Sequence, residues 1–339
     1  MSGDDRLFSL VVPVLNEQEV LADTYATLTP ILEGLDRPYE VVVVDNGSTD
    51  ATPEIAAGLC GRDRRWRYLR LSRNFGYQNS ITAGMLACSG AAVMVIDADL
   101  QDPPELIPQF VAHWQRGYDV VYGIREKRVG ESRLRTLPTM AAMRLITWMS
   151  DDPKLPAHSG DFRLLSRRAV DALALMPETN RYVRGVIHWL GFNQVGIPYT
   201  RRGRVKGTSK VNWPYLIGFT YNAIINFSAK PVRLFALTGL AVLALTALLS
   251  VVWLCGLVPG LTGLHLLTLL NLGVLSAGLG VVGEYVYKVH IESKRRPLWL
   301  VDYTVNLDPA ILARPLDVAS GMPHIVALRP PADRPRAAA

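Results

Sequence analysis

The chain has 339 residues, of which 49% are hydrophobic, and its formal net charge is +6 at pH 7. This charge is modest for so long a chain, so we expect no nucleic-acid partner and an affinity for an anionic membrane surface instead. The three cysteines, Cys60, Cys88 and Cys255, are too widely spaced for a zinc motif or a disulfide framework, which favours a reducing cytosol.

The amino-terminal half alternates between short apolar runs and helix-length segments. The runs are rich in valine, isoleucine and leucine and predict strands buried on both faces, over 8–14, 40–44, 67–71, 92–96 and 119–122. Helices are expected over 17–32, 52–60, 77–88 and 104–115. This alternation predicts an α/β domain with a Rossmann-like, mostly parallel, doubly wound sheet, which we expect to be complete before Tyr199.

Acidic residues follow two of the predicted strands. Asp97 and Asp99 frame one alanine after the fourth strand, and Gln101 and Asp102 come next. Ligands bind outside the carboxyl ends of strands in such sheets, and oxygen ligands suit Mg²⁺ or Mn²⁺ with a nucleotide diphosphate. Two acidic residues in a turn are more often merely solvated, so the triplet alone is a weak signal. Asp45 ends the second strand before a turn that either caps a helix or meets a ligand, and its position favours the ligand.

Two long stretches without charged residues occupy the carboxyl-terminal third, over 234–258 and 261–283. Each is long enough to span a bilayer, and the alternative is a buried helical hairpin. Lys and Arg flank the pair at both ends and are absent from the loop between them. We therefore expect a multi-pass protein of the cytoplasmic (inner) membrane, with both long ends in the cytosol and no signal peptide.

The segments around these spans complete the predicted organisation. Residues 211–230 mix aromatic side chains with few charges, which predicts helices at the membrane interface. The predicted division is a cytoplasmic domain over 1–207, amphipathic juxtamembrane helices over 208–232, a two-helix transmembrane hairpin over 233–287 and a cytoplasmic tail over 288–339. The tail is rich in proline and alanine after 309, and we expect it to be largely disordered there.

Several motifs occur together in a fixed order: VVPVLNEQE, VVVDNGSTDAT, RNFGYQNSITAG, VIDADLQDPPELI, GYDVVYGIR, SGDFRLLSRRAVDAL, and GTSK before the two spans. From about residue 7 to residue 297 the chain resembles the polyprenyl-phosphate glycosyltransferases of the inverting GT-A class. These include dolichyl-phosphate mannose synthase and the bactoprenol glucosyl transferases. The resemblance implies a GT-A catalytic domain, a divalent metal (Mg²⁺ or Mn²⁺), a nucleotide sugar donor and a polyprenyl phosphate acceptor in the membrane.

The resemblance also implies roles for single residues. Those matching the donor site are Pro13, Asn16, Glu17, Asp45 and Asp97. Those matching the metal site are Asp97, Asp99 and Gln101. Asp99 and Gln101 are expected as direct ligands, with Asp97 nearer the ribose or bridged through water. Many relatives have a second aspartate where this chain has Asn46, so no donor role is assigned to that position.

Basic residues match positions that hold the lipid phosphate in such relatives: Arg125, Arg201, Arg204 and Lys210. Arginine suits this role because its planar fork binds two oxygens at once. The alternative for the run over 200–210 is attraction to the anionic leaflet, and we expect both effects.

Catalytic roles are expected for Asp99, through the metal, and for Asp161 as a candidate acid/base. The alternatives for Asp161 are that it caps the helix from Arg167 onward or pairs with Arg163. A phosphate monoester has a second pKa near 6, so such an acceptor is mostly a dianion at neutral pH and needs little help from a base. We therefore favour a positioning or metal-side role for Asp161, whereas a hydroxyl acceptor would restore the need for a base.

The expected reaction is the transfer of a hexose to a polyprenyl phosphate at the cytoplasmic membrane face, with inversion at the anomeric carbon. UDP-glucose is the best guess for the donor, and a GDP-mannose-dependent enzyme is an alternative. A processive polysaccharide synthase is disfavoured, because Gln-x-x-Arg-Trp is absent and two spans make a poor channel. A non-catalytic membrane scaffold is disfavoured by the retained carboxylates. The oligomeric state is left open, with a homo-oligomer among the options.

Overall fold

The computed structural model describes residues 6–128, 159–176, 178, 183–202, 230–255 and 262–308. The chain forms two compact units. The first, here called the sheet unit, combines Met1–Thr136, Pro156–Lys210 and Pro297–Ala339, and the second, here called the hairpin unit, combines Leu137–Leu155 and Val211–Arg296. The sheet unit is therefore discontinuous in sequence, because the chain leaves it for the hairpin and then returns.

The sheet unit is built on one eight-stranded sheet in the order β7-β5-β6-β4-β1-β2-β3-β8. Its strands are β1 (Phe8–Val14), β2 (Tyr39–Asp45), β3 (Trp66–Leu71), β4 (Ala92–Val95), β5 (Val120–Arg128), β6 (Ser159–Ser166), β7 (Gln194–Arg201) and β8 (Val301–Val305). Strand β1 is parallel to β2 and β4, β2 to β3, and β5 to β7. The antiparallel strands are β6, between β4 and β5, and β8, beside β3. This arrangement confirms the predicted mostly parallel α/β sheet.

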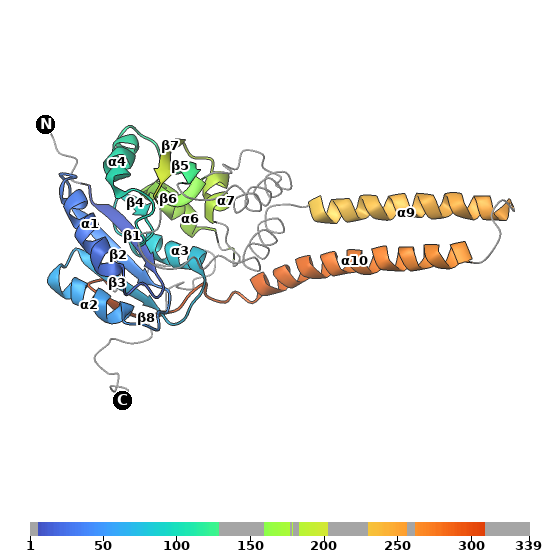
Figure 1. Cartoon of the computed structure of the whole chain (residues 1–339), viewed down its shortest axis with the longest axis horizontal. Helices are drawn as coiled ribbons and strands as arrows, with labels where there is room; N and C mark the ends of the chain where they lie inside the picture. Colours follow the sequence, from blue (N-terminus) through green and yellow to red (C-terminus); the bar gives the residue numbers. More distant parts are fainter. Residues whose placement is uncertain are drawn as a thin grey trace, which may run out of the picture. The chain divides into compact units, whose positions relative to one another are not determined.

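Helices cover both faces of the sheet (Figure 1). One face carries α1 (Leu21–Glu33), α2 (Thr52–Arg62) and α4 (Ile107–Gln115), and side chains such as Leu10, Leu28 and Phe110 form one buried apolar cluster there. On the other face α3 (Tyr77–Ala87) lies so close that a Cβ on Gly84 would be 2.4 Å from Val11 Cγ1. Near α3 packs α6 (Arg167–Ala174), and η1 (Pro104–Leu106) and α7 (Val183–Trp189) complete the described helices of this unit. The order β3-β2-β1-β4 brings the carboxyl ends of these four parallel strands to one edge.

The predicted elements of the amino-terminal half are present, with shifted boundaries. Helix α1 begins at Leu21 instead of residue 17, and it is preceded by a turn in which the carbonyl of Glu17 accepts from the amides of Val20 and Leu21. Strand β5 continues to Arg128, so Arg125 lies within this strand and not at its end. Strands β6, β7 and β8 were not predicted, and the expectation of a sheet complete before Tyr199 is wrong, since β7 contains this residue and β8 comes later.

Strand β8 follows the hairpin and lies inside the segment that was assigned to a tail. It pairs antiparallel with β3, at the edge of the sheet. Val301, the first residue of this strand, and Trp299, just before it, are fully buried, which attaches the returning chain to the core. The expected disorder after 309 concerns residues outside the described ranges.

The hairpin unit contains two long apolar helices, α9 (Lys230–Leu254) and α10 (Thr262–Ser293). Within them Val232–Trp253 and Leu270–Ser293 are long and apolar enough to cross a membrane, by length and composition. Asn271 Nδ2 of α10 donates a hydrogen bond of 2.9 Å to Thr246 Oγ1 of α9. Polar contacts of this kind stabilise helix pairs in lipid, where no water competes for them. The predicted interfacial helices and the loop between the spans lie largely outside the described residues.

Candidate active site

The acidic loop after β4 is a tight turn at the carboxyl edge of the sheet. Leu100 has a left-handed backbone with φ 51°, and the amide of Gln101 donates to Asp99 Oδ1 at 3.2 Å. Thr24 Oγ1 of α1 donates to the carbonyl of Ala98 at 2.8 Å, which attaches the turn to this helix. The structure therefore places Asp97, Asp99 and Gln101 in one fixed loop, as the sequence predicted.

Asp97 lies in a markedly negative environment. Its Oδ1 accepts a hydrogen bond of 2.6 Å from the Tyr77 hydroxyl, and its Oδ2 is 3.9 Å from Arg201 Nη2. Burial, together with the neighbouring carboxylates of Asp102 and Asp99, raises the pKa of Asp97 to about 6. Burial beside Asp97 also raises the pKa of Tyr77 well above its ordinary value, so this phenol stays protonated and donates. A divalent cation would relieve the crowding of negative charge in this loop.

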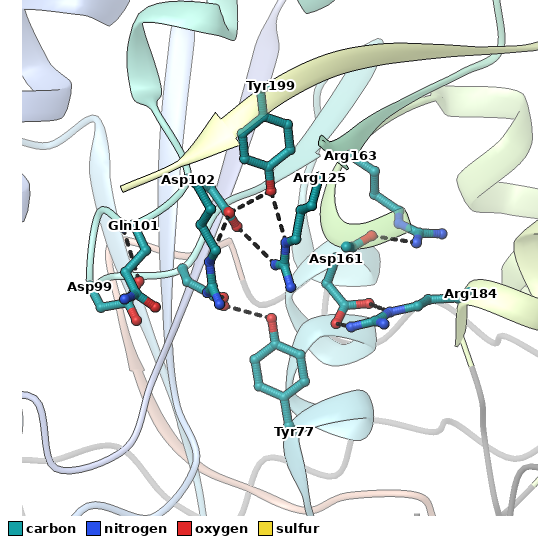
Figure 2. A network of polar contacts seen from close by, with 12 residues as sticks. Tyr77, Asp99, Gln101, Asp102, Arg125, Asp161, Arg163, Arg184 and Tyr199 are labelled. Carbon is teal, nitrogen blue, oxygen red and sulfur yellow. Dashed lines mark hydrogen bonds and ion pairs between the residues drawn. The ribbon is translucent and has the colours of Figure 1, made fainter. Parts of the chain in front are cut away.

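Asp102 joins cationic and phenolic side chains from β5 and β7. Its carboxylate is 1% exposed and accepts a hydrogen bond of 2.5 Å from the Tyr199 hydroxyl. Arg125 Nη2 lies 3.3 Å from Asp102 Oδ2, and Arg201 Nε lies 3.2 Å from Asp102 Oδ1. Arg125 Nε in turn donates to Tyr199 at 3.0 Å (Figure 2). One buried carboxylate thus fixes two of the four predicted phosphate-binding cations beside the acidic loop.

Gly160 of β6 makes room for one of these cations. A Cβ at this position would be 2.7 Å from Arg125 Nη2, well inside contact distance. Any larger residue would therefore displace the guanidinium from its place beside Asp102. The requirement for glycine arises from the antiparallel pairing of β6 with β5, which sequence patterns did not predict.

Asp161, the next residue of β6, is held by Arg184 of α7. Arg184 Nε donates to Oδ1 at 2.9 Å and Arg184 Nη2 to Oδ2 at 2.6 Å, a two-pronged arrangement that Figure 2 shows. Burial alone would raise the pKa of Asp161, but Arg184, with Arg163 and Arg125 nearby, outweighs it and lowers the pKa to about 2. The cap of α6 is Ser166, whose side chain accepts from the Ala169 amide. Asp161 therefore does not cap this helix. Its bidentate partner is Arg184.

Asp45 at the end of β2 is fully buried and shapes the turn that follows it. Its Oδ1 accepts from the Ser48 amide at 2.7 Å, and its Oδ2 accepts from the Tyr68 hydroxyl at 2.5 Å and from Arg70 Nη1 at 3.2 Å. Gly47 has φ 82° in this turn, a conformation that side chains disfavour. The expected contact of Asp45 with the donor base stays a prediction, and its present contacts give it a structural role in the loop.

The turn after β2, here called the donor loop (residues 45–52), is tied to the chain after β1. The Asn16 amide donates to Ser48 Oγ at 2.9 Å, and Asn16 Oδ1 accepts from the Thr49 amide at 2.8 Å. The Glu17 amide donates to Thr52 Oγ1 at 2.9 Å. Asn16, Glu17 and Asp45 are therefore brought together, as expected for residues of one binding site.

Two further residues near the donor loop have clear structural roles. Pro13 is buried within β1, opposite Val44 of β2. Asn46 Oδ1 accepts from the Phe75 amide at 2.9 Å, and its Nδ2 donates to Asn74 Oδ1 at 3.0 Å. The amide at position 46 thus organises the loop before α3.

The structure describes part of the predicted cation set. Arg125 and Arg201 lie at the site, whereas Arg204 and Lys210 lie outside the described residues. Among the described residues, no three acidic, histidine or cysteine side chains gather as a complete metal site. Two carboxylates and one amide nevertheless suit Mg²⁺ or Mn²⁺, because these ions complete their shell with substrate phosphates and water. The donor set of the acidic loop therefore fits a metal held jointly with a diphosphate.

Sequence patterns missed the side chains that position the predicted site: Tyr68, Arg70, Tyr77, Asp102, Arg184 and Tyr199. Asp102 carried the clearest signal, as a further carboxylate directly after the metal motif. Tyr77 lies in the RNFGYQ motif, which gave a weaker signal. The others are separated in sequence from the groups they contact by up to 97 residues, so only the fold brings them together.

Comparisons with known proteins identify the family of this chain. The family model described as "Glycosyl transferase family 2" matches residues 9–174. A bactoprenol glucosyl transferase of Shigella phage SfV is 36% identical over 300 residues, covering 86% of this chain and 97% of the relative. A prophage bactoprenol glucosyl transferase homolog of Escherichia coli (strain K12) is 35% identical over 300 residues, covering 86% and 97%. The uncharacterized glycosyltransferase YkcC of Bacillus subtilis (strain 168) is 36% identical over 313 residues, covering 91% and 97%. The chain therefore belongs to glycosyl transferase family 2, as its motifs predicted.

Proposed function

We propose that this glycosyltransferase transfers one hexose, with glucose as the best candidate, from a nucleotide sugar to a polyprenyl phosphate. The transfer takes place at the cytoplasmic face of the membrane and inverts the anomeric carbon. One observation supports the proposal most directly. Arg125 and Arg201 both form ion pairs with Asp102, next to the acidic loop that contains Asp97. The cations proposed to bind phosphate thus lie next to the carboxylates proposed to bind a metal, which supports a reaction between a diphosphate donor and a phosphate acceptor.

The relatives and the hairpin unit support the two substrates. Two of the relatives are named bactoprenol glucosyl transferases, and their names point to glucose and to a lipid carrier. The candidate spans in α9 and α10 would keep the enzyme at the membrane in which a polyprenyl phosphate resides. We propose UDP as the nucleotide, with GDP-mannose as the alternative donor.

On the donor side, the residues proposed to bind the nucleotide sugar are Pro13, Asn16, Glu17, Asp45 and Asp97. Asn16 and Asp45 fix the donor loop through short hydrogen bonds to Ser48 and Thr49, which preorganises it for a ligand. Asp99 and Gln101 would hold Mg²⁺ or Mn²⁺ directly, with Asp97 nearer the ribose or bridged through water. A metal bound there would offset the charge that develops on the leaving diphosphate.

On the acceptor side, Arg125 and Arg201 would bind the lipid phosphate, with Arg204 and Lys210 as further proposed contacts. A phosphate monoester is mostly a dianion at neutral pH, so one of its oxygens attacks the anomeric carbon without giving up a proton. The bond to the diphosphate breaks on the opposite face, which inverts the configuration. With a pKa of about 2, Asp161 stays ionised and is a poor base. We therefore assign it a positioning role through Arg184.

The proposal is tested with purified full-length protein in neutral detergent, supplied with polyprenyl phosphate, Mg²⁺ or Mn²⁺, and a panel of UDP- and GDP-sugars. We expect release of nucleoside diphosphate and formation of a glycolipid, both dependent on the acceptor, with UDP-glucose as the best donor. A preference for GDP-mannose would correct the donor and leave the reaction class standing. Failure of every donor to react in the presence of acceptor and metal would contradict the proposed function and favour a non-catalytic scaffold.

A further inference from the structure

The strand that follows the hairpin is attached to β3 and α2 at several points. In the antiparallel pairing of β8 with β3, Tyr303 lies opposite Arg70. Just beyond β8, Asn306 Nδ2 donates to the carbonyls of Cys60 at 2.7 Å and Trp66 at 3.0 Å, which lie at α2 and the start of β3. These contacts fix the register of β8, although the whole hairpin separates it in sequence from the other strands of the sheet.

Two consecutive residues of β8 contact the two side chains of β3 that bind Asp45. Asp302 Oδ2 lies 3.6 Å from Arg70 Nε, and the Tyr303 ring packs against Tyr68 with a centroid distance of 5.6 Å. Tyr68 and Arg70 both donate to Asp45 Oδ2, at 2.5 and 3.2 Å. The strand therefore lies directly behind the groups that bind the buried carboxylate.

The guanidinium of Arg70 is engaged on all its nitrogens. Nη1 binds Asp45, Nη2 donates to the carbonyl of Ser48 at 2.9 Å, and Nε faces Asp302. A planar guanidinium group with a partner on each side is held in one orientation. Loss of one partner lets the long arginine side chain adopt other rotamers. The side chain of Arg70 is only 20% exposed, so water does not readily replace the missing partner. Loss of Asp302 would therefore remove one of the contacts that orient Arg70 beside the donor loop.

We propose that Asp302 is a positioning residue of the donor site, acting through Arg70. Donor affinity then depends on a strand that the chain adds only after its two apolar helices. The inference rests on the proposed function, because it takes the donor loop as the place where the nucleotide binds.

The test compares variants of the full-length protein in detergent, with UDP and GDP as probes, each titrated by calorimetry in the presence of Mn²⁺. We expect Asp302→Asn to weaken binding of the preferred nucleotide about threefold to tenfold, as loss of a partly buried ion pair implies. The same variant should raise the KM for the sugar nucleotide and leave the KM for the lipid acceptor unchanged. Asp302→Glu keeps the charge and should restore most of the affinity.

The matched control is Asp171→Asn on α6. Asp171 forms an ion pair of similar length with Arg167, at 3.5 Å, but its side chain is 65% exposed and it belongs to α6 instead of the donor loop. This variant should bind nucleotide as the parent protein does. Thermal unfolding of all variants shows whether the fold is retained.

Asp45→Asn separates failure of this inference from failure of the proposed function. If Asp45→Asn loses affinity and Asp302→Asn binds as the parent does, the inference is overturned and the donor site stands. If Asp302→Asn lowers donor and acceptor affinity alike, or lowers only the unfolding temperature, its role is merely structural and the inference is also overturned. If Asp45→Asn itself binds nucleotide normally, the donor loop is wrongly assigned and the proposed donor site fails with it.

Discussion

Arg184 binds the carboxylate of Asp161 with two hydrogen bonds, of 2.9 and 2.6 Å, and these bonds favour its ionised form. The folded-state pKa of about 2 lies below the ordinary aspartate value, so the ionised form is favoured by the fold. The stability that this pair contributes is fully present above the unfolded pKa, near 4, and is lost as the pH falls through about 2. Across the range in which the enzyme is assayed, Asp161 therefore does not titrate.

The first prediction concerns the pH profile of kcat/KM for the acceptor. Asp161→Asn should lower the whole profile by loosening Arg184, while the midpoint of the acid limb stays where it is in the parent protein. The measurement is kcat/KM from pH 5 to pH 9 for both proteins. An acid limb that disappears or moves by a full unit in the variant would show that Asp161 titrates during catalysis.

The second prediction concerns Asp102, the buried carboxylate that fixes Arg125, Arg201 and Tyr199. Asp102→Asn removes the charge that orients both guanidinium groups, so the acceptor's kcat/KM should fall about tenfold to a hundredfold, as loss of charge-assisted bonds implies. Nucleotide affinity should change less, because the donor loop is held by Asn16, Asp45 and Arg70. Steady-state kinetics with each substrate varied in turn gives the two values.

Tyr199→Phe is the matched control for Asp102. It removes one hydroxyl from the same cluster and leaves the ion pairs, so the loss should be no more than about tenfold. A larger effect from Tyr199→Phe than from Asp102→Asn would contradict the account of Asp102 as the organising group.

The third prediction uses the close approach at Gly160. The added methyl of Gly160→Ala would meet the end of the Arg125 side chain, which can swing away, so the fold should survive while the cation is displaced. We expect the acceptor's kcat/KM to fall about tenfold to a hundredfold, the cost of misplacing a binding group by an ångström or so. Gly58→Ala in α2 is the control, because nothing lies within 4 Å of the added methyl. Equal activity of the two variants would contradict the proposal that Arg125 binds the acceptor phosphate.

The sequence predicted those parts of the fold whose signals are local. Strands such as Phe8–Val14 are continuous apolar runs, and the Asp97–Asp99 motif is contiguous, so both could be recognised without knowledge of the fold. Strand β8 could not, because Tyr303 acquires its place only by pairing with Arg70, more than two hundred residues earlier. The cluster on Asp102 likewise depends on the sheet order, in which β6 lies between β4 and β5, and β7 pairs with β5. The ligand roles of the predicted residues stay predictions, since they concern substrates and a metal.

The central claim is tested most directly by Asp99→Asn, assayed as acceptor-dependent release of nucleoside diphosphate at saturating Mg²⁺ or Mn²⁺. An amide oxygen does not replace an anionic ligand opposite a diphosphate, so turnover should fall by at least about a hundredfold. The variant should remain folded and membrane-bound, and Asp36→Asn, at an exposed residue, should keep parental activity. Parental activity of Asp99→Asn would contradict the metal site and the mechanism built on it.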